Sequence, residues 1–203
     1  MSPPRPHDLL RLSAAHRPPP DVPAWAAAAL NVTPWVVVRR SATESGLIPV
    51  GVRGTTRSER YAMEMEPSDV REVVAPEDLA HAAPGRDLAA MTTLQTVRPL
   101  LDGTGLAWGP TGSVGFELAT GLHTATAESD LDLVVRVPGG LADVLPALAA
   151  VHDGLRHLAA RVDCQVETDW GAVALAELIG DQSDVMVRTV RGPRLIRRAV
   201  AVS

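Results

Sequence analysis

Two aspartates separated by a single residue constrain this chain more than any other feature. Asp130 and Asp132 stand at the head of the apolar run 133–135, a pattern that predicts a buried β-strand over residues 130–137. Because strand side chains alternate between faces, both carboxylates point the same way, a few ångströms apart. Like charges this close repel each other, and a divalent cation between them relieves the repulsion. Carboxylate oxygens suit Mg²⁺, which commonly binds one or two carboxylates together with substrate phosphates.

A glycine–serine pair lies upstream of the aspartates. Gly112 and Ser113 follow a short apolar segment and precede residues 114–119, which are expected to be helical. A glycine turn at a helix N-terminus presents free backbone N–H groups that hold phosphate. Gly-Ser followed by Asp-x-Asp on a strand resembles the signature of the DNA-polymerase-β-like nucleotidyltransferase superfamily. The resemblance implies that Gly112 and Ser113 grip a triphosphate and that Asp130 and Asp132 hold two Mg²⁺ ions. The alternative for the aspartates is a solvated strand edge.

A third carboxylate is expected on a neighbouring strand, over residues 161–168. Alternation places Asp163 and Glu167 on the same face of that strand. The superfamily resemblance implies that this acid binds the catalytic metal and accepts the proton of the attacking hydroxyl. Asp163 matches best by position, and Glu167 is its competitor. The alternative for Glu167 is that it caps the strand end or pairs with an arginine there.

Composition limits the class of protein. The 203 residues include one cysteine, Cys164, and no lysine, and the net charge is −5. A lone cysteine suits a reducing compartment, no apolar run approaches the ~20 residues of a membrane span, and no secretory signal is visible. A cytoplasmic location is therefore expected. The acidic balance argues against nucleic acid as the main partner, and any phosphate clamp must be built from arginine.

The order of the expected elements predicts two domains. Residues 1–85 are interpreted as a small α+β domain that ends in a linker at 76–85, and residues 86–203 alternate strands and helices. The expected fold class is α/β (α+β): a nucleotidyltransferase-type mixed sheet flanked by helices, with a smaller N-terminal α+β domain.

Four local features give expectations of their own. Short helices are expected at 7–12 and 172–178, and a longer one from residue 88 until Pro99 interferes. Pro49, inside a strand expected at 47–54, suggests an edge position.

An arginine-rich turn marks the N-terminal domain. If residues 55–62 are helical, Arg53, Arg57 and Arg60 project to one side, where three guanidiniums can clamp a polyphosphate. The alternative is an ordinary solvated face. His7 is a further candidate for contact with substrate phosphate, and its alternative is an N-terminal surface residue.

The combined pattern is similar to the malonate decarboxylase holo-acyl-carrier-protein synthase family, also called phosphoribosyl-dephospho-CoA transferase. The similarity covers residues 5 to 200, and the segments that carry it are 6–10, 50–54 with Arg57 and Arg60, 109–121, 129–133 and 162–168. The Gly-Ser and Asp-x-Asp parts are shared with the wider superfamily. The stretch 116–121 and the arginine turn are what point to this family.

The resemblance implies a specific reaction. The donor would be 2′-(5″-triphosphoribosyl)-3′-dephospho-CoA and the acceptor a serine of the apo acyl carrier protein of malonate decarboxylase, with release of pyrophosphate. Asp130, Asp132 and Asp163 would hold two Mg²⁺ ions, which stabilise the attacking and leaving oxygens. Two alternatives remain open: a nucleotidyltransferase for another hydroxyl acceptor, on a small molecule or a protein, and a catalytically inactive carrier-protein-binding module.

The end of the chain is expected to form a closing hairpin from residues 185–190 and 194–197. Five arginines fall within eleven residues there: Arg188, Arg191, Arg194, Arg197 and Arg198. Because the chain is acidic overall, docking of an acidic carrier protein needs a local basic patch. The alternative is that these arginines pair with acids of their own domain.

Overall fold

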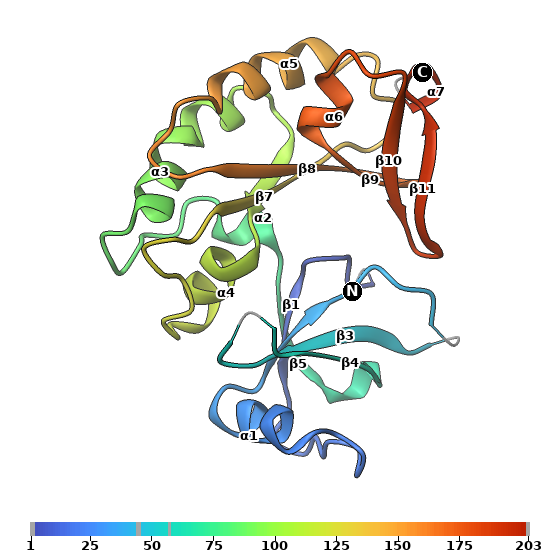
Figure 1. Cartoon of the computed structure of the whole chain (residues 1–203). Coiled ribbons are helices and arrows are strands. Elements are labelled where there is room, and N and C mark those ends of the chain that lie inside the picture. Colours follow the sequence, from blue (N-terminus) through green and yellow to red (C-terminus); the bar gives the residue numbers. More distant parts are fainter. Residues whose placement is uncertain (1–2, 44–45, 57, 202–203) are drawn as a thin grey trace. The chain divides into compact units, whose positions relative to one another are not determined.

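A computed structural model describes residues 3–43, 46–56 and 58–201, and the chain divides into two compact units, Met1–Ala75 and Pro76–Ser203 (Figure 1). The sequence placed this division after residue 85. The segment expected as a linker instead begins the second unit, because helix α2 (Pro76–Leu79) packs against strand β6 (Ala107–Pro110). Gly109 permits the approach, since a Cβ there would lie 1.8 Å from the carbonyl oxygen of Pro76.

The N-terminal unit is a five-stranded antiparallel sheet in the order β4-β3-β2-β1-β5, with one α-helix packed against it. Its elements are β1 (Leu9–Leu12), α1 (Ala24–Val32), β2 (Trp35–Val38), β3 (Ile48–Arg53), β4 (Arg60–Met65), a 3₁₀ turn η1 (Pro67–Asp69) and β5 (Val70–Val74). Alternate residues of β3, including Val50 and Val52, are buried in one core with Ala26 and Leu30 of α1. This alternation is the period of two that a sheet with one covered face requires.

Two expectations for this unit were wrong. Residues 9–12 form a strand and not a helix, because β1 pairs with both β2 and β5. Pro49 does not mark an edge, since β3 lies between β2 and β4. The carbonyl of Pro49 accepts a hydrogen bond from the N–H of Arg39, one residue beyond the end of β2. Pro49 therefore lies opposite a residue beyond the end of β2, where its lack of an N–H group removes no hydrogen bond from the β2–β3 ladder.

The C-terminal unit is built on a six-stranded mixed sheet in the order β11-β10-β9-β8-β7-β6. Its further elements are α3 (Ala89–Asp102), α4 (Gly112–Thr120), β7 (Leu131–Arg136), α5 (Leu145–Gly154), β8 (Val162–Thr168), β9 (Gly171–Ala174), α6 (Leu175–Ile179), β10 (Asp184–Thr189), β11 (Gly192–Arg197) and α7 (Arg198–Ala201). Strands β7 and β8 are parallel, and the other pairs are antiparallel. The mixed sheet expected from the sequence is confirmed.

The two faces of this sheet differ. Helices α3, α5 and α6 cover one face (Figure 1), where Leu94, Leu148 and Leu178 share a core with Leu131 and Leu133 of β7. Because strand side chains alternate, the residues between those of the core point to the opposite face. That opposite face carries the aspartates singled out in the sequence.

Three further expectations needed correction. Helix α3 continues past Pro99 to Asp102, because buried Val97 and Leu101 extend its apolar stripe beyond the proline. Residues 171–174 form strand β9 rather than the start of a helix, since they pair with both β8 and β10. The apolar residues between 141 and 160 predict one helix over that whole range, but α5 spans only Leu145–Gly154. Within the part of the chain that the structure describes, no helix is long and apolar enough to cross a membrane.

Candidate active site

The acidic residues come together through the parallel pairing of β7 and β8. Asp132 on β7 is the direct register partner of Asp163 on β8, so the two carboxylates leave the same face of the sheet side by side. Asp130 lies two residues before Asp132, just ahead of the strand, and points to the same face by alternation. All three side chains are partly exposed, so solvent and substrate can reach them.

Glu167 does not share this location. Its register partner is Arg136, four residues along the strand from the Asp132–Asp163 pair, which is a distance of about 13 Å. Glu167 is also buried, with 7% of its surface exposed. The register therefore favours Asp163 over Glu167 as the third acid, and the role itself remains a prediction.

The glycine–serine turn lies directly against the acids. Gly112 is the first residue of α4 and has a φ of +60°. A Cβ at this position would lie 1.9 Å from Oδ2 of Asp132, so no other residue leaves the carboxylate in place. The N–H of Thr111, the residue before the helix, donates to the backbone oxygen of Asp132 at 2.8 Å. The open N-terminus of α4 and the Asp132 carboxylate therefore form one site, where backbone N–H groups can meet an anion.

A guanidinium completes the group. The Nη2 atom of Arg161 donates to Oδ1 of Asp163 at 2.8 Å. The pKa of Arg161 is raised by this hydrogen bond first, then by the charge of Asp163, with further contributions from Asp130 and Asp132. The positive charge of Arg161 therefore interacts with all three carboxylates. The sequence pointed to Arg161 only as part of the strand pattern, because its reach to Asp130 and Asp132 depends on strand pairing.

The acids fit a divalent cation that arrives with its substrate. Among the described residues, no group of three or more histidine, cysteine or acidic side chains is arranged to hold a metal ion unaided. Asp132 and Asp163 nevertheless supply adjacent hard oxygen donors, and the absence of a Cβ at Gly112 lets the Asp132 carboxylate lie against the α4 turn. Mg²⁺ commonly takes one or two carboxylates and completes its shell with water and substrate phosphates, which is the donor set available here.

Behind the turn, a buried carboxylate ties α4 to the loop that leads to the acids. Glu117 accepts hydrogen bonds from Nε and Nη2 of Arg86, at 2.7 and 2.6 Å. It also accepts from the backbone N–H groups of Thr124 and Ala125, both at 2.9 Å. Burial acts to raise the pKa of Glu117, but these hydrogen bonds outweigh it and the pKa lies below its usual value. The hydrogen bonds to Glu117, followed by the charge of that carboxylate, raise the pKa of Arg86.

The loop continues this network toward the phosphate turn. The hydroxyl of Thr124 donates to the carbonyl of Ser113 at 2.8 Å, and the N–H of Thr126 donates to the hydroxyl of Ser129 at 2.9 Å. The hydroxyls of Ser113 and Ser129 lie 3.4 Å apart. The contacts of Glu117 therefore fix the segment that brings Ser129 next to Ser113 of the turn. The sequence pointed to Glu117 only as part of the stretch 116–121.

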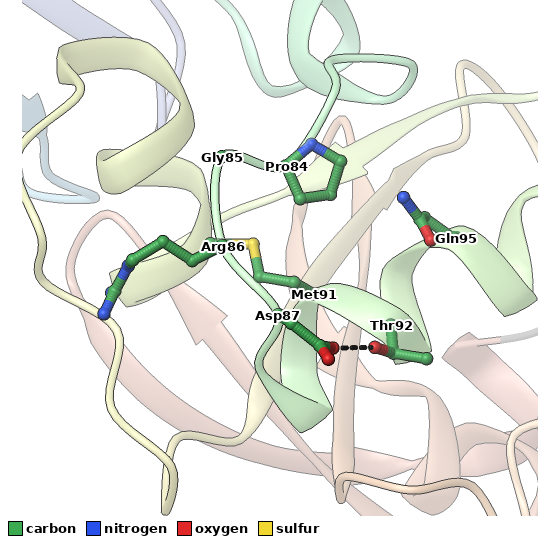
Figure 2. A pocket seen from close by; sticks show the side chains of 7 residues that line it. All are labelled: Pro84, Gly85, Arg86, Asp87, Met91, Thr92 and Gln95. Atoms are coloured by element: carbon green, nitrogen blue, oxygen red, sulfur yellow. Dashed lines mark hydrogen bonds between the residues drawn. The ribbon is translucent and has the colours of Figure 1, made fainter.

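A pocket of about 380 Å³ opens beside Arg86, at the start of α3 (Figure 2). It is lined by Pro84, Gly85, Arg86, Asp87, Met91, Thr92 and Gln95. Figure 2 shows the Arg86 side chain directed away from Gln95, and the hydroxyl of Thr92 donating to Asp87 at 3.4 Å. The lining includes none of the three aspartates, so we assign the candidate site to the acids and the α4 turn.

Comparisons with known proteins identify the family of this chain. Family models described as the N-terminal and C-terminal domains of phosphoribosyl-dephospho-CoA transferase MdcG match residues 5–76 and 78–199. A phosphoribosyl-dephospho-CoA transferase of Pseudomonas putida is 40% identical over 203 residues, which is 100% of this chain and 98% of the relative. Relatives of the same name from Pseudomonas putida strain W619 and Azotobacter vinelandii strain DJ are 39% and 40% identical, covering 97% and 95% of this chain and 95% and 92% of their own. No solved structure matches. The chain belongs to the phosphoribosyl-dephospho-CoA transferase family.

As a member of this family the protein is a transferase. The family's C-terminal domain model covers the acids and the α4 turn, and its N-terminal model covers the arginine turn. The only cysteine is Cys164, which is 7% exposed and packs in the core of the C-terminal unit. Burial raises the pKa of its thiol to about 12, so it is not a nucleophile at neutral pH.

The arginine turn has a different structure from the one expected. The described residues of the segment 55–62 do not form a helix, since Arg60 begins strand β4 and its register partner is Arg53 on β3. Glu59 closes the turn by accepting from the N–H of Thr56 at 2.9 Å. Arg57 lies outside the described residues.

Strand pairing still brings two of the three guanidinium side chains to one face of the N-terminal sheet, because directly opposed residues of an antiparallel pair share a face. His7 is in the same unit, with a φ of +74° that is uncommon outside glycine. Its backbone N–H donates to the carbonyl of Val38 at 3.0 Å. The phosphate-binding roles of Arg53, Arg57, Arg60 and His7 stay predictions.

Proposed function

We propose that this protein transfers the phosphoribosyl-dephospho-CoA group from 2′-(5″-triphosphoribosyl)-3′-dephospho-CoA to a serine of the apo acyl carrier protein of malonate decarboxylase. The serine oxygen forms a new bond to the α-phosphorus, the bond from that phosphorus to the β-phosphate bridge breaks, and pyrophosphate leaves. Full-length similarity to relatives that carry the transferase name supports the donor. The identity of the acceptor, a serine of this carrier protein, is the more specific part of the proposal.

The contact between Gly112 and Asp132 carries the proposal. A helix N-terminus that can hold phosphate lies against a carboxylate that can hold a phosphate-bound cation. Transfer of this kind needs positioning and charge neutralisation more than covalent chemistry. An open turn beside acids on adjacent strands supplies both at a single point.

Each group then has a separate task. The backbone N–H groups at Gly112 and Ser113 hold the β- and γ-phosphates, which become the leaving pyrophosphate. Asp163 accepts the proton of the serine hydroxyl, since it is the acid on the strand next to Asp132. Magnesium ions held by Asp130, Asp132 and Asp163 would neutralise charge on the phosphates. Arg161 neutralises the same carboxylates until the substrate enters.

The arginine turn is a phosphate-binding candidate within the N-terminal unit. Arg53 and Arg60 are opposed across β3 and β4, and two guanidiniums on one face can bind phosphate oxygens in bidentate fashion. We assign them, with Arg57, to the phosphates of the donor. Replacing Arg53 by alanine should then raise KM for the donor more than KM for the carrier.

Mass spectrometry of the apo carrier protein tests the proposal directly. The carrier is incubated with the enzyme, the triphosphoribosyl donor and Mg²⁺, and its mass should increase by one prosthetic group as pyrophosphate appears. A carrier with its acceptor serine changed to alanine is the matched control and should stay unmodified. Transfer of a nucleoside monophosphate from ATP to the carrier, in place of the prosthetic group, would refute the donor assignment.

A further inference from the structure

The sheet face that carries the acids continues, strand by strand, into the C-terminal hairpin. Arg136 on β7 pairs with Glu167 on β8, Glu167 with Ala172 on β9, and Ala172 with Arg188 on β10. Directly paired residues share a face, so Arg188 lies on the same face of the sheet as Asp132 and Asp163.

The hairpin presents an exposed apolar pair on this face. Met186 of β10 and Leu195 of β11 are register partners two residues from Arg188 along β10, and they are 37% and 64% exposed. The next pair along is Asp184 with Arg197. Leu195 lies about 15 Å from Asp163, by the spacing of three strands and two residues. A small protein seated on this pair can therefore place a side chain at the acids.

The charge of the hairpin is opposite to that of the chain. Residues 184–198 hold five arginines and one aspartate, a net charge of +4, whereas the whole chain carries −5. Among the described residues, Arg197 alone of these five arginines makes an ion pair, with Asp184 at 3.6 Å. The alternative, in which the hairpin arginines form ion pairs with acids of their own domain, therefore applies to Arg197 and not to the other four.

The strands divide these arginines between two faces. Arg188 and Arg197 lie on the face of the acids, beside Met186 and Leu195. Arg194 is the register partner of buried Val187, so it points to the face covered by α6. The sequence treated these arginines as equivalent, because the pleat that separates them is visible only once the register of the hairpin is known.

We propose that the face of the β10–β11 hairpin formed by Met186, Arg188, Leu195 and Arg197 is the docking surface for the acceptor protein. It fits a partner whose own surface is acidic around an exposed apolar residue. This inference rests on the proposed function, since it assumes that the acceptor is a protein. The arginines steer the partner toward the sheet edge, and the apolar pair holds it with its serine directed toward Asp163.

The test is the association of the full-length enzyme with immobilised apo acyl carrier protein, measured by surface plasmon resonance over a series of salt concentrations. The double variant Arg188→Glu/Arg197→Ser should lower the association rate constant at low salt by about tenfold or more and flatten its salt dependence. Leu195→Ser should mainly raise the dissociation rate constant. The KM for the donor should stay at the wild-type value in both variants.

Two charge reversals serve as matched controls. Arg194→Glu changes the other face of the same hairpin. Arg156→Glu changes an exposed arginine just after helix α5, which is one of the helices that cover the sheet. Both should associate like the wild type. Equal loss in Arg194→Glu and in the double variant would overturn the assignment of the face, and unchanged association in the double variant would overturn the docking surface itself.

The outcomes separate this inference from the proposed function. If the wild type modifies the carrier while the double variant associates normally, the docking surface is wrong and the function stands. If the wild type binds the carrier through the hairpin but does not modify it, the function is wrong and the surface stands. A rise in the donor KM of the double variant would assign the hairpin to the donor, and a self-associating wild type that becomes monomeric in the variant would assign it to a second copy of this chain.

Discussion

Replacing Gly112 by alanine should remove most of the transfer activity while the protein still folds. A Cβ at this position would lie 1.9 Å from Oδ2 of Asp132, whereas ordinary contact begins at 3.4 Å. The carboxylate and the α4 turn must therefore move apart by about 1.5 Å to restore ordinary contact. Either movement parts the phosphate-binding N–H groups from the carboxylate that is assigned to the cation.

The magnitude follows from two separate costs. A misplacement of about 1 Å at a reacting centre costs on the order of 100-fold in rate, which is about 2.7 kcal/mol of activation free energy. The left-handed φ of +60° adds about 1–2 kcal/mol to the free energy of the folded state once a Cβ is present. For a chain of this size, that lowers the melting temperature by roughly 2–8 °C. The variant should therefore fold and be nearly inactive.

Gly121 provides the matched control. It ends α4 with a φ of +73°, and a Cβ there would have no neighbour within 4 Å. Gly121→Ala should lose the same few degrees of melting temperature while it retains the rate of transfer. The assay is single-turnover transfer to the carrier, followed by mass spectrometry, beside a thermal melt of each variant. A Gly112→Ala enzyme within about tenfold of the wild-type rate would refute the proposed juxtaposition of turn and carboxylate.

Four further predictions follow from the same geometry. Asp132→Asn should fold normally and retain less than a tenth of the transfer rate, and it should lose any Mg²⁺-dependent rise in melting temperature on addition of donor; a rate above that level would remove Asp132 from the site. Asp163→Ala should reduce kcat far more than Glu167→Ala, which should chiefly lower the melting temperature because that residue is buried; the reverse order would move the role. Glu117→Gln should lower the melting temperature, and above about pH 5 this loss should not change with pH. The loss should shrink as the pH falls through the depressed pKa of Glu117 in the folded state, because the carboxyl of the unfolded chain titrates at about 4.3. A loss that is independent of pH would contradict the stabilising role of the charged carboxylate. The Cys164 thiol should resist alkylation at pH 8 until the protein unfolds, given its pKa of about 12.

The central elements of the site were predictable because they depend on local periods. Alternation alone assigned Asp130 and Asp132 to one face, and residues Leu131–Arg136 do form strand β7. The glycine that precedes a helical run does begin α4. In both cases the side-chain directions follow from residues that are adjacent in the sequence.

The remaining geometry depends on contacts between distant segments. The opposition of Asp132 to Asp163 requires the register of two parallel strands joined by a crossover helix, and no local period determines that register. The bond between Arg86 and Glu117 spans 31 residues. Strand β9 was missed for a related reason, because its short run of small apolar residues satisfies a helical period as well as a strand period until its two neighbouring strands are known.

The arginine turn shows how a wrong secondary structure can still bring the right side chains together. A helix over residues 55–62 would have aligned Arg53 with Arg60 through helical spacing, and the β3–β4 hairpin aligns the same two through cross-strand pairing. Like charges directly opposed on a sheet repel each other. An anion placed between the two guanidiniums offsets that repulsion. The hairpin therefore keeps Arg53 and Arg60 as candidates for a phosphate clamp, because cross-strand pairing places both side chains on one face of the sheet.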